Sequence, residues 1–199
     1  MVHIGFDVDG VLANCMGAFL PWYNQRHDTS FVEQDLWTHE WWTVLGVSKE
    51  RFNQEITLFV ASPAEYVMQP YQCMPAIVKR LATQHQLSQV TARFTPTSLA
   101  HAQAFSDYHY SNCFAAIHRS HHPEENPQGY KGVVCKREGV AVLVEDQTNY
   151  ALEAFQHGIK VILIKRPWNV QPSIPASIPR IDAKDLETTV AYMLNGAAH

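Results

Sequence analysis

Short apolar runs alternate with helical patterns along most of this chain, and this alternation restricts the fold more than any other feature of the sequence. The runs are rich in β-branched residues and several end in polar ones, which is typical of buried strands in a parallel sheet. Parallel strands joined through helices need crossover connections, so helices are expected on both faces of the sheet. The predicted strands are residues 2–7, 86–92, 114–119, 140–146 and 160–165, and the predicted helices of this part are residues 75–85, 97–109, 131–138, 148–157 and 184–194.

The interval from residue 14 to residue 85 separates the first two predicted strands and is too long for one crossover helix. It shows helical periodicity at 14–26 and 48–59 and no convincing strand. We therefore predict a Rossmann-like, three-layer α/β/α core with a parallel sheet, formed by residues 1–13 and 86–199. Residues 14–85 are predicted to form a small helical cap over the carboxyl ends of the strands.

Composition and charge narrow the class of protein further. With 199 residues, of which 46% are hydrophobic and 17% charged, the chain can form a sizeable core. A formal net charge of −4 is unfavourable for binding a nucleic-acid polymer. We expect neither a membrane span nor a signal segment, because the apolar runs are too short. Four widely spaced cysteines without a CxxC pair are typical of reduced thiols, so we predict a cytoplasmic protein. A homodimer is left open.

Reactive side chains gather where the predicted strands end, and open parallel sheets bind ligands at that edge. Carboxylates that converge there repel one another unless a cation lies among them, and oxygen ligands of this kind suit Mg²⁺. A hydroxyl and an ammonium group at the same edge suit the oxygens of a phosphate. The residues are Asp7 and Asp9 after the first strand, Thr91, Ala92 and Arg93 at the end of the second, Lys131 at the start of a helix, and Glu145 and Asp146 at the end of the fourth strand.

Four motifs, in this order along the chain, resemble those of the haloacid dehalogenase (HAD) superfamily of phosphohydrolases. FDVDGVLA is similar to the first motif, QVTAR to the second, Lys131 to the third and LVEDQTN to the acidic fourth. The TAR sequence, VEDQTNYA, PWN at 167–169 and the helical insertion resemble the branch that contains 5′(3′)-deoxyribonucleotidases and related nucleotidases. The resemblance implies a HAD-type fold and a Mg²⁺-dependent phosphomonoesterase that acts on a small phosphate ester, expected to be a nucleoside monophosphate.

The resemblance also implies a role for each matching residue. Asp7 would attack phosphorus and form an aspartyl-phosphate. Asp9 would protonate the leaving oxygen and then activate water, and Gly10 would let the chain turn sharply beside the phosphate. The implied phosphate-binding residues are Thr91, Ala92 and Lys131, and the implied magnesium ligands are Asp7, the backbone carbonyl of Asp9, and Asp146, with Glu145 contacting a water of the ion.

These motifs have structural interpretations that the sequence leaves open. The Asp-x-Asp pair can form a simple turn or the metal site of a sugar transferase. Thr91 could cap a helix, and Lys136 competes with Lys131 for the third-motif position. Glu145 and Asp146 could be ordinary loop acids.

Several functions also remain as alternatives. Dehalogenation lacks support, because the second acid and the metal-binding acids have no use in it. A phosphotransferase would pass the aspartyl-phosphate to an acceptor other than water. A non-catalytic, receiver-like module that binds phosphate and Mg²⁺ uses similar residue types, although the acid at position 9 favours catalysis.

The predicted cap contains an aromatic cluster, WTHEWW, that could contact the substrate. Trp37 and Trp41 would share one face if this segment were helical, and Trp42 follows them. Such clusters form cap cores as well as ligand platforms. Cys15 stands where the deoxyribonucleotidase branch has an aromatic residue, which bears on the substrate. The histidine-rich segment 118–126 matches no firm zinc spacing and is interpreted as a loop.

Overall fold

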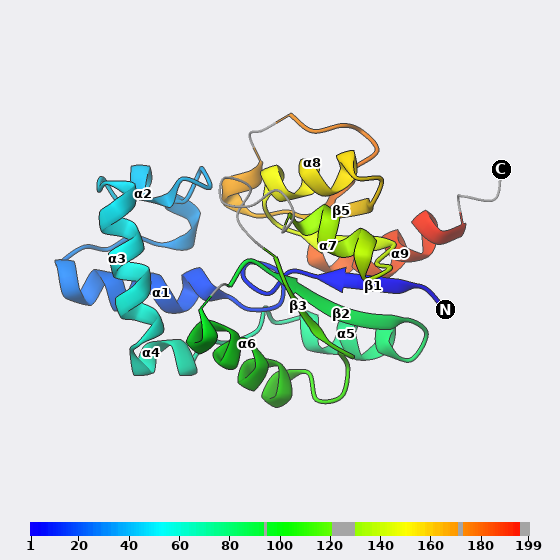
Figure 1. The fold of residues 1–199 in the computed structure, drawn as a ribbon. Coiled ribbons are helices and arrows are strands. Elements are labelled where there is room, and N and C mark those ends of the chain that lie inside the picture. The colour runs from blue at the N-terminus through cyan, green and yellow to red at the C-terminus, as the bar shows by residue number, and fades with distance from the viewer. Residues whose placement is uncertain (94, 121–129, 171–172, 196–199) are drawn as a thin grey trace.

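The computed structural model describes residues 1–93, 95–120, 130–170 and 173–195. Its core is a parallel sheet of six strands in the order β3-β2-β1-β4-β5-β6 (Figure 1). This order confirms the predicted Rossmann-like α/β class with a parallel sheet. The strands are β1 (His3–Phe6), β2 (Gln86–Thr91), β3 (Ile117–Arg119), β4 (Val142–Glu145), β5 (Lys160–Ile164) and β6 (Arg180–Ile181).

Helices cover both faces of the sheet because successive strand residues point to opposite sides and both sets are apolar. Val144 and Ile162 pack in one buried cluster, and their neighbours Leu143 and Val161 pack in a second one on the opposite face. The first face carries α5 (Met74–Ala82), α6 (Pro96–His109) and α9 (Leu186–Asn195), and the second carries α7 (Lys131–Arg137) and α8 (Thr148–Gln156). Figure 1 shows α5 and α6 on one side of the strands and α7 and α8 on the other.

Between β1 and β2 the chain forms a group of helices beyond the carboxyl ends of the strands (Figure 1). Phe19 is the centre of their packing, with its ring 5.5 Å from that of Phe59 and 5.8 Å from that of Phe52. The whole interval is described, and none of it forms a strand. Its elements before α5 are α1 (Cys15–His27), a 3₁₀ turn (Glu33–Asp35), α2 (Trp41–Val44), α3 (Lys49–Val60) and α4 (Pro63–Tyr66).

The chain leaves the sheet and returns to it through two segments that are bonded to each other. Ala13 forms an antiparallel bridge with Pro70. The Asn14 amide donates to the Gln69 carbonyl at 2.9 Å, and the Tyr71 amide donates to the Leu12 carbonyl at 3.3 Å. After this stem, α5 packs against β2 and α9. The division into a core and a cap at residues 13 and 85 stays a prediction.

Some elements differ from the sequence-based expectations. The strand expected at 114–119 forms only at its last three residues. β6, which directly follows the four prolines between residues 167 and 179, was not expected. The N-cap of α6 is Thr95, whose hydroxyl accepts from the Ser98 amide at 3.0 Å, so Thr91 does not cap this helix. None of the helices in the described part of the chain has the length and apolar character needed to cross a membrane.

Candidate active site

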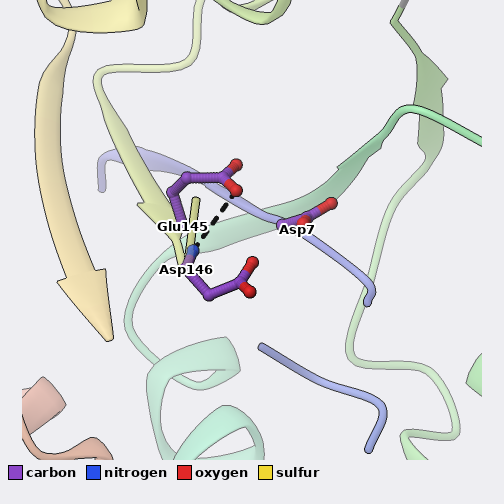
Figure 2. A group of neighbouring side chains, drawn as sticks. All are labelled: Asp7, Glu145 and Asp146. Carbon is purple, nitrogen blue, oxygen red and sulfur yellow. Dashed lines mark hydrogen bonds between the residues drawn. The ribbon is translucent and has the colours of Figure 1, made fainter. Parts of the chain in front are cut away.

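Three carboxylates converge at the carboxyl ends of the two central strands, as Figure 2 shows. Asp7 follows β1, Glu145 ends β4 and Asp146 follows it. One oxygen atom from each lies within 4.8 Å of the others, and all three residues are buried. The sheet brings them together because β1 and β4 are paired in parallel, and the Asp7 amide donates to the Val144 carbonyl at 2.9 Å.

The turn after β1 packs closely against the carboxylate of Asp146 at Gly10. Gly10 has a φ of +80°, a region that L side chains rarely adopt. A Cβ atom at this position would lie 2.1 Å from Oδ2 of Asp146. The Gly10 amide donates to the Ala13 carbonyl at 3.0 Å, which closes the turn. Glycine is therefore required here for both conformation and space.

Lys131 is the buried counter-charge of the carboxylates. Its ammonium lies 2.8 Å from Oδ1 of Asp7 and 2.7 Å from Oε2 of Glu145. It also lies 4.4 Å from the centre of the Tyr150 ring. Lys136, the other candidate for the third motif, is exposed on the same helix. Only Lys131 of these two lines the cavity described below.

Burial and mutual repulsion change the protonation of the cluster. Burial, and then the nearby Glu145 carboxylate, raise the pKa of Asp7 to about 7, against the opposing effect of Lys131. Burial, Glu145 and Asp7 together raise the pKa of Asp146 well above its ordinary value. Burial alone would lower the pKa of Lys131, but Asp7 and Glu145 raise it. One ammonium facing three acids leaves negative charge that a divalent cation with oxygen ligands would neutralise, so these residues fit Mg²⁺.

The 3₁₀ turn Pro167–Asn169 fixes Asp146 through hydrogen bonds to its side chain and to its backbone carbonyl. The indole Nε1 of Trp168 donates to Oδ2 of Asp146 at 2.8 Å. The side-chain amide of Asn169 donates to the carbonyls of Asp146 and Ile164, both at 2.7 Å. No role of their own was predicted for Trp168 and Asn169 from the sequence. The signal that could have found them is the position of PWN directly after the fifth strand.

Thr91 and Asp9 complete the edge of the site. Thr91 ends β2 and is buried, and its hydroxyl accepts from the Arg93 amide at 3.2 Å. Both oxygens of Asp9 accept from the guanidinium of Arg93, at 2.7 and 2.8 Å. Arg93 was placed at this edge by the sequence, but its pairing with Asp9 was not anticipated. Thr91 and Ala92 line the same cavity as Asp7, Asp9 and Lys131.

A cavity of about 500 Å³ lies between this edge and the helices α1–α4. The part of the wall that the cap helices supply is mostly apolar and includes Phe19, Trp41 and Phe59. Trp41 stacks on His39, with ring centres 5.0 Å apart, and contacts the Trp168 ring edge-on at 5.7 Å. The cap wall therefore reaches the residue that holds Asp146.

Of the other residues expected at the substrate, Cys15 lines the cavity, whereas Trp42 and Trp37 do not. Cys15 lines the cavity, and burial raises the pKa of its thiol well above its ordinary value. Trp42 packs against Phe52, at 6.2 Å between ring centres, and does not line the described cavity wall. Trp37 lies outside α2, which begins at Trp41, and is 61% exposed. The segment from Trp37 to Trp41 is therefore not one helix, so the condition under which these two side chains would share a helical face is not met.

The histidine-rich segment is only partly described. His118 lies on β3, with Nδ1 3.7 Å from a carboxylate oxygen of Glu138. Residues 121–126, which include the other histidines of this segment, lie outside the described residues.

Comparisons with known proteins support the fold. No family model and no curated protein matches the sequence. The structure is similar to a hydrolase of the haloacid dehalogenase-like family from Streptococcus pneumoniae, with a TM-score of 0.65, 18% identity and coverage of 96% of this chain and 98% of that chain.

Two further solved structures show the same architecture. One is described as a predicted phosphoglycolate phosphatase from Haemophilus somnus, with a TM-score of 0.62, 16% identity and coverage of 94% and 96% of the two chains. The other is a HAD-hydrolase from Bacillus subtilis, described as bound to magnesium and as revealing interdomain movement, with a TM-score of 0.63, 16% identity and coverage of 95% and 98%. The chain therefore has a HAD-type fold.

Proposed function

We propose that this protein is a Mg²⁺-dependent phosphomonoesterase that acts through an aspartyl-phosphate. The observation that carries the proposal is the convergence of Asp7, Glu145 and Asp146 with buried Lys131 beside Thr91, at one edge of the sheet. The neighbours described as hydrolases and phosphatases share the fold that forms this edge. The magnesium described in the Bacillus subtilis structure supports the choice of ion.

Asp7 is the nucleophile in this proposal. A carboxylate oxygen of Asp7 attacks phosphorus, the bond from phosphorus to the ester oxygen breaks, and that oxygen takes a proton from Asp9. Water then attacks phosphorus in the aspartyl-phosphate and gives a proton to Asp9. The bond from phosphorus to the Asp7 oxygen breaks, so that phosphate is released and the Asp7 carboxylate is restored. Thr91, the Ala92 backbone and Lys131 bind the phosphoryl oxygens as their charge develops.

A bound Mg²⁺ would neutralise charge on the phosphate and the acids. Asp7, the Asp9 carbonyl and Asp146 would hold it. Glu145 accepts from the amides of Asp146 and Gln147, at 3.2 and 3.1 Å, and from Lys131. Glu145 therefore fixes Lys131 beside Asp7 as well as contributing to the cluster.

The cavity wall favours a nucleoside monophosphate as the substrate. Its aromatic part faces the acids across the cavity, and stacking of a base on an aromatic side chain contributes about 1–3 kcal/mol. The lysine and arginine side chains among the described lining residues are Lys131 and Arg93, and carboxylates bind both. This distribution favours a leaving group without a carboxylate of its own, in contrast to phosphoglycolate. The cytoplasmic location and a homodimer stay predictions.

Phosphate release tests this function directly. Nucleoside 5′- and 3′-monophosphates, sugar phosphates, phosphoglycolate and an aryl phosphate would be compared with and without Mg²⁺, with Asp7→Asn as the control. We expect release that needs both Mg²⁺ and Asp7 and is fastest with a nucleoside ester. Absence of release from every ester by the folded protein would contradict the proposal and favour a phosphotransferase or a binding module.

A further inference from the structure

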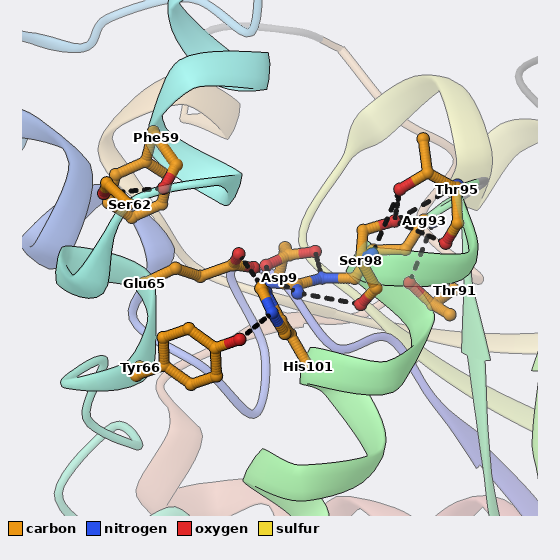
Figure 3. A network of polar contacts seen from close by, with 10 residues as sticks. All are labelled: Asp9, Phe59, Ser62, Glu65, Tyr66, Thr91, Arg93, Thr95, Ser98 and His101. Carbon is orange, nitrogen blue, oxygen red and sulfur yellow. Dashed lines mark hydrogen bonds and ion pairs between the residues drawn. The ribbon is translucent and has the colours of Figure 1, made fainter.

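A line of buried charges joins the cap helices to Asp9 (Figure 3). Arg93 lies at its centre. On one side its Nε and Nη2 atoms donate to the two Asp9 oxygens. On the other side its Nη1 atom donates to Oε1 of Glu65 at 2.6 Å. Because Glu65 lies on α4 and Arg93 follows β2, this line crosses between the cap helices and the sheet.

Glu65 is itself fixed on its second oxygen. Oε2 of Glu65 lies 2.5 Å from Nδ1 of His101 on α6, and Nε2 of that ring lies 2.6 Å from the Tyr66 hydroxyl. The Glu65 side chain is 1% exposed and that of Arg93 is 10% exposed. Glu65 is thus bonded to Arg93 through one oxygen and to His101 through the other, and a buried ionic group bonded at both ends has little freedom to reorient.

This arrangement determines the orientation of Asp9. A planar guanidinium that bonds both oxygens of a carboxylate fixes its plane as well as its distance. Arg93 is the shared cation between the carboxylates of Asp9 and Glu65, at 2.7 and 2.6 Å. For the acid step, one Asp9 oxygen carries the proton and leaves its bond to Arg93, while the other oxygen stays bonded to Arg93. Glu65 keeps its own bond to Arg93 throughout, so no buried charge is left alone.

We propose that Arg93 and Glu65 are positioning residues for Asp9: Arg93 orients the Asp9 carboxyl, and Glu65 holds Arg93 in place from the cap. The proposal rests on the proposed function, in which Asp9 protonates the leaving oxygen. It makes the alignment of Asp9 depend on the position of α4 over the sheet. An enzyme whose cap helices are displaced would keep Asp7 and Lys131 in place but lose the alignment of Asp9.

The dependence of the rate on the leaving group separates this role from a structural one. An alkoxide leaving from a nucleoside monophosphate needs a proton, whereas 4-nitrophenolate leaves readily without one. We would therefore measure kcat/KM with Mg²⁺ for both esters, because this constant reports the steps up to breakage of the ester bond. The variants are Glu65→Gln and Arg93→Lys, with Asp9→Asn as the reference for loss of the acid.

We expect the ratio of kcat/KM for the nucleoside ester to that for the aryl ester to fall about tenfold or more in Glu65→Gln, toward the ratio of Asp9→Asn. Arg93→Lys keeps the buried charge but cannot bond both Asp9 oxygens in the same way, so its ratio should fall as well. If Glu65→Gln folds poorly, the kcat/KM ratio of Arg93→Lys tests the proposal instead.

The matched control is Glu55→Gln. Glu55 is also a buried carboxylate of the cap helices, paired with Arg51 at 2.5 Å and with His27 at 3.2 Å, and it does not line the described cavity. Its ratio should equal that of the wild type. An unchanged ratio in folded Glu65→Gln or Arg93→Lys would overturn the positioning role, whether kcat/KM stays the same for both esters or falls equally for both. Failure of the proposed function would differ, because the wild type would then release phosphate from neither ester.

Discussion

At the scale of single residues, the candidate site consists of charged groups that are buried and therefore depend on one another. Lys131 contacts two carboxylates and is fully buried. A buried charge is tolerated only where partners compensate its lost hydration. The Lys131 ammonium, which would bind phosphate, therefore also stabilises the buried carboxylates when no ligand is bound.

We expect Lys131→Met to destabilise the protein measurably. The change leaves Asp7 and Glu145 buried without their ammonium, and removal of one partner of a buried ion pair costs about 3–5 kcal/mol. The free energy of unfolding in urea, measured without Mg²⁺, would report it. Lys136→Met is the control, because this lysine is exposed on the same helix and its loss should change stability by no more than about 0.5 kcal/mol. Equal stabilities of the two variants would contradict the expectation.

Some contacts of the site could be expected from the sequence and others could not. The parallel order of the strands requires Asp7 and Asp146 to meet at one edge, because β1 and β4 are neighbours. Pairing of Arg93 with Glu65 depends on where the cap helices lie over the sheet. No spacing along the chain specifies that position, so this contact was not predictable from the residues alone.

At the scale of elements, the packing of α7 on α8 places Lys131 in the site. The two helices approach closely at Gly132, where an added Cβ atom would lie 2.8 Å from Cα of Ala154. The Gly132 amide also donates to a carboxylate oxygen of Glu153 at 2.9 Å. A small residue next to Lys131 therefore determines how deeply α7 reaches toward the sheet.

Gly132→Ala should separate the two helices and displace Lys131. Overpacking of this kind costs about 1–3 kcal/mol, and we expect slower phosphate release together with the lower stability. Urea unfolding and the phosphate assay on the same samples would measure both effects. Lys136→Ala, on the exposed side of α7, should change neither. Full activity and stability of Gly132→Ala would show that α7 adjusts without cost.

Elements with two apolar faces were the predictable part of the fold. The strands β4 and β5 have apolar residues on both faces, so their runs stand out in the sequence. β6 has only two residues, which directly follow Pro179, and it depends on its pairing with β5. The short helix α4 begins with a Ser62 cap and Pro63, signals that the sequence contains. Its length of four residues gives no periodicity to recognise.

At the scale of the whole molecule, the cavity is formed by two parts with different chemistry. The sheet edge supplies charge, and the cap helices supply most of the apolar wall. Trp41 joins the two parts through its contact with Trp168. In the proposed function, the sheet edge carries out phosphoryl transfer and the cap wall selects the leaving group.

Trp41→Leu should therefore impair substrate selection more than catalysis. Loss of a stacking surface worth about 1–3 kcal/mol should raise KM for a nucleoside monophosphate about tenfold, with a smaller effect for a small alkyl phosphate. Steady-state kinetics on both esters would show the difference. Trp37→Leu is the control, because Trp37 is exposed and does not line the described cavity. Equal effects of the two substitutions would remove Trp41 from the substrate site.

The bonded stem formed around Ala13 and Pro70 makes the cap a replaceable module. Its two segments leave and rejoin the sheet side by side, so the distance between them stays short whatever lies between. Residues beyond the stem can be lengthened, shortened or exchanged without shifting the register of β1 against β2. New substrate ranges can therefore arise in such a protein by exchange of one contiguous segment, provided that the new segment keeps a carboxylate in the place of Glu65 to hold Arg93 beside Asp9.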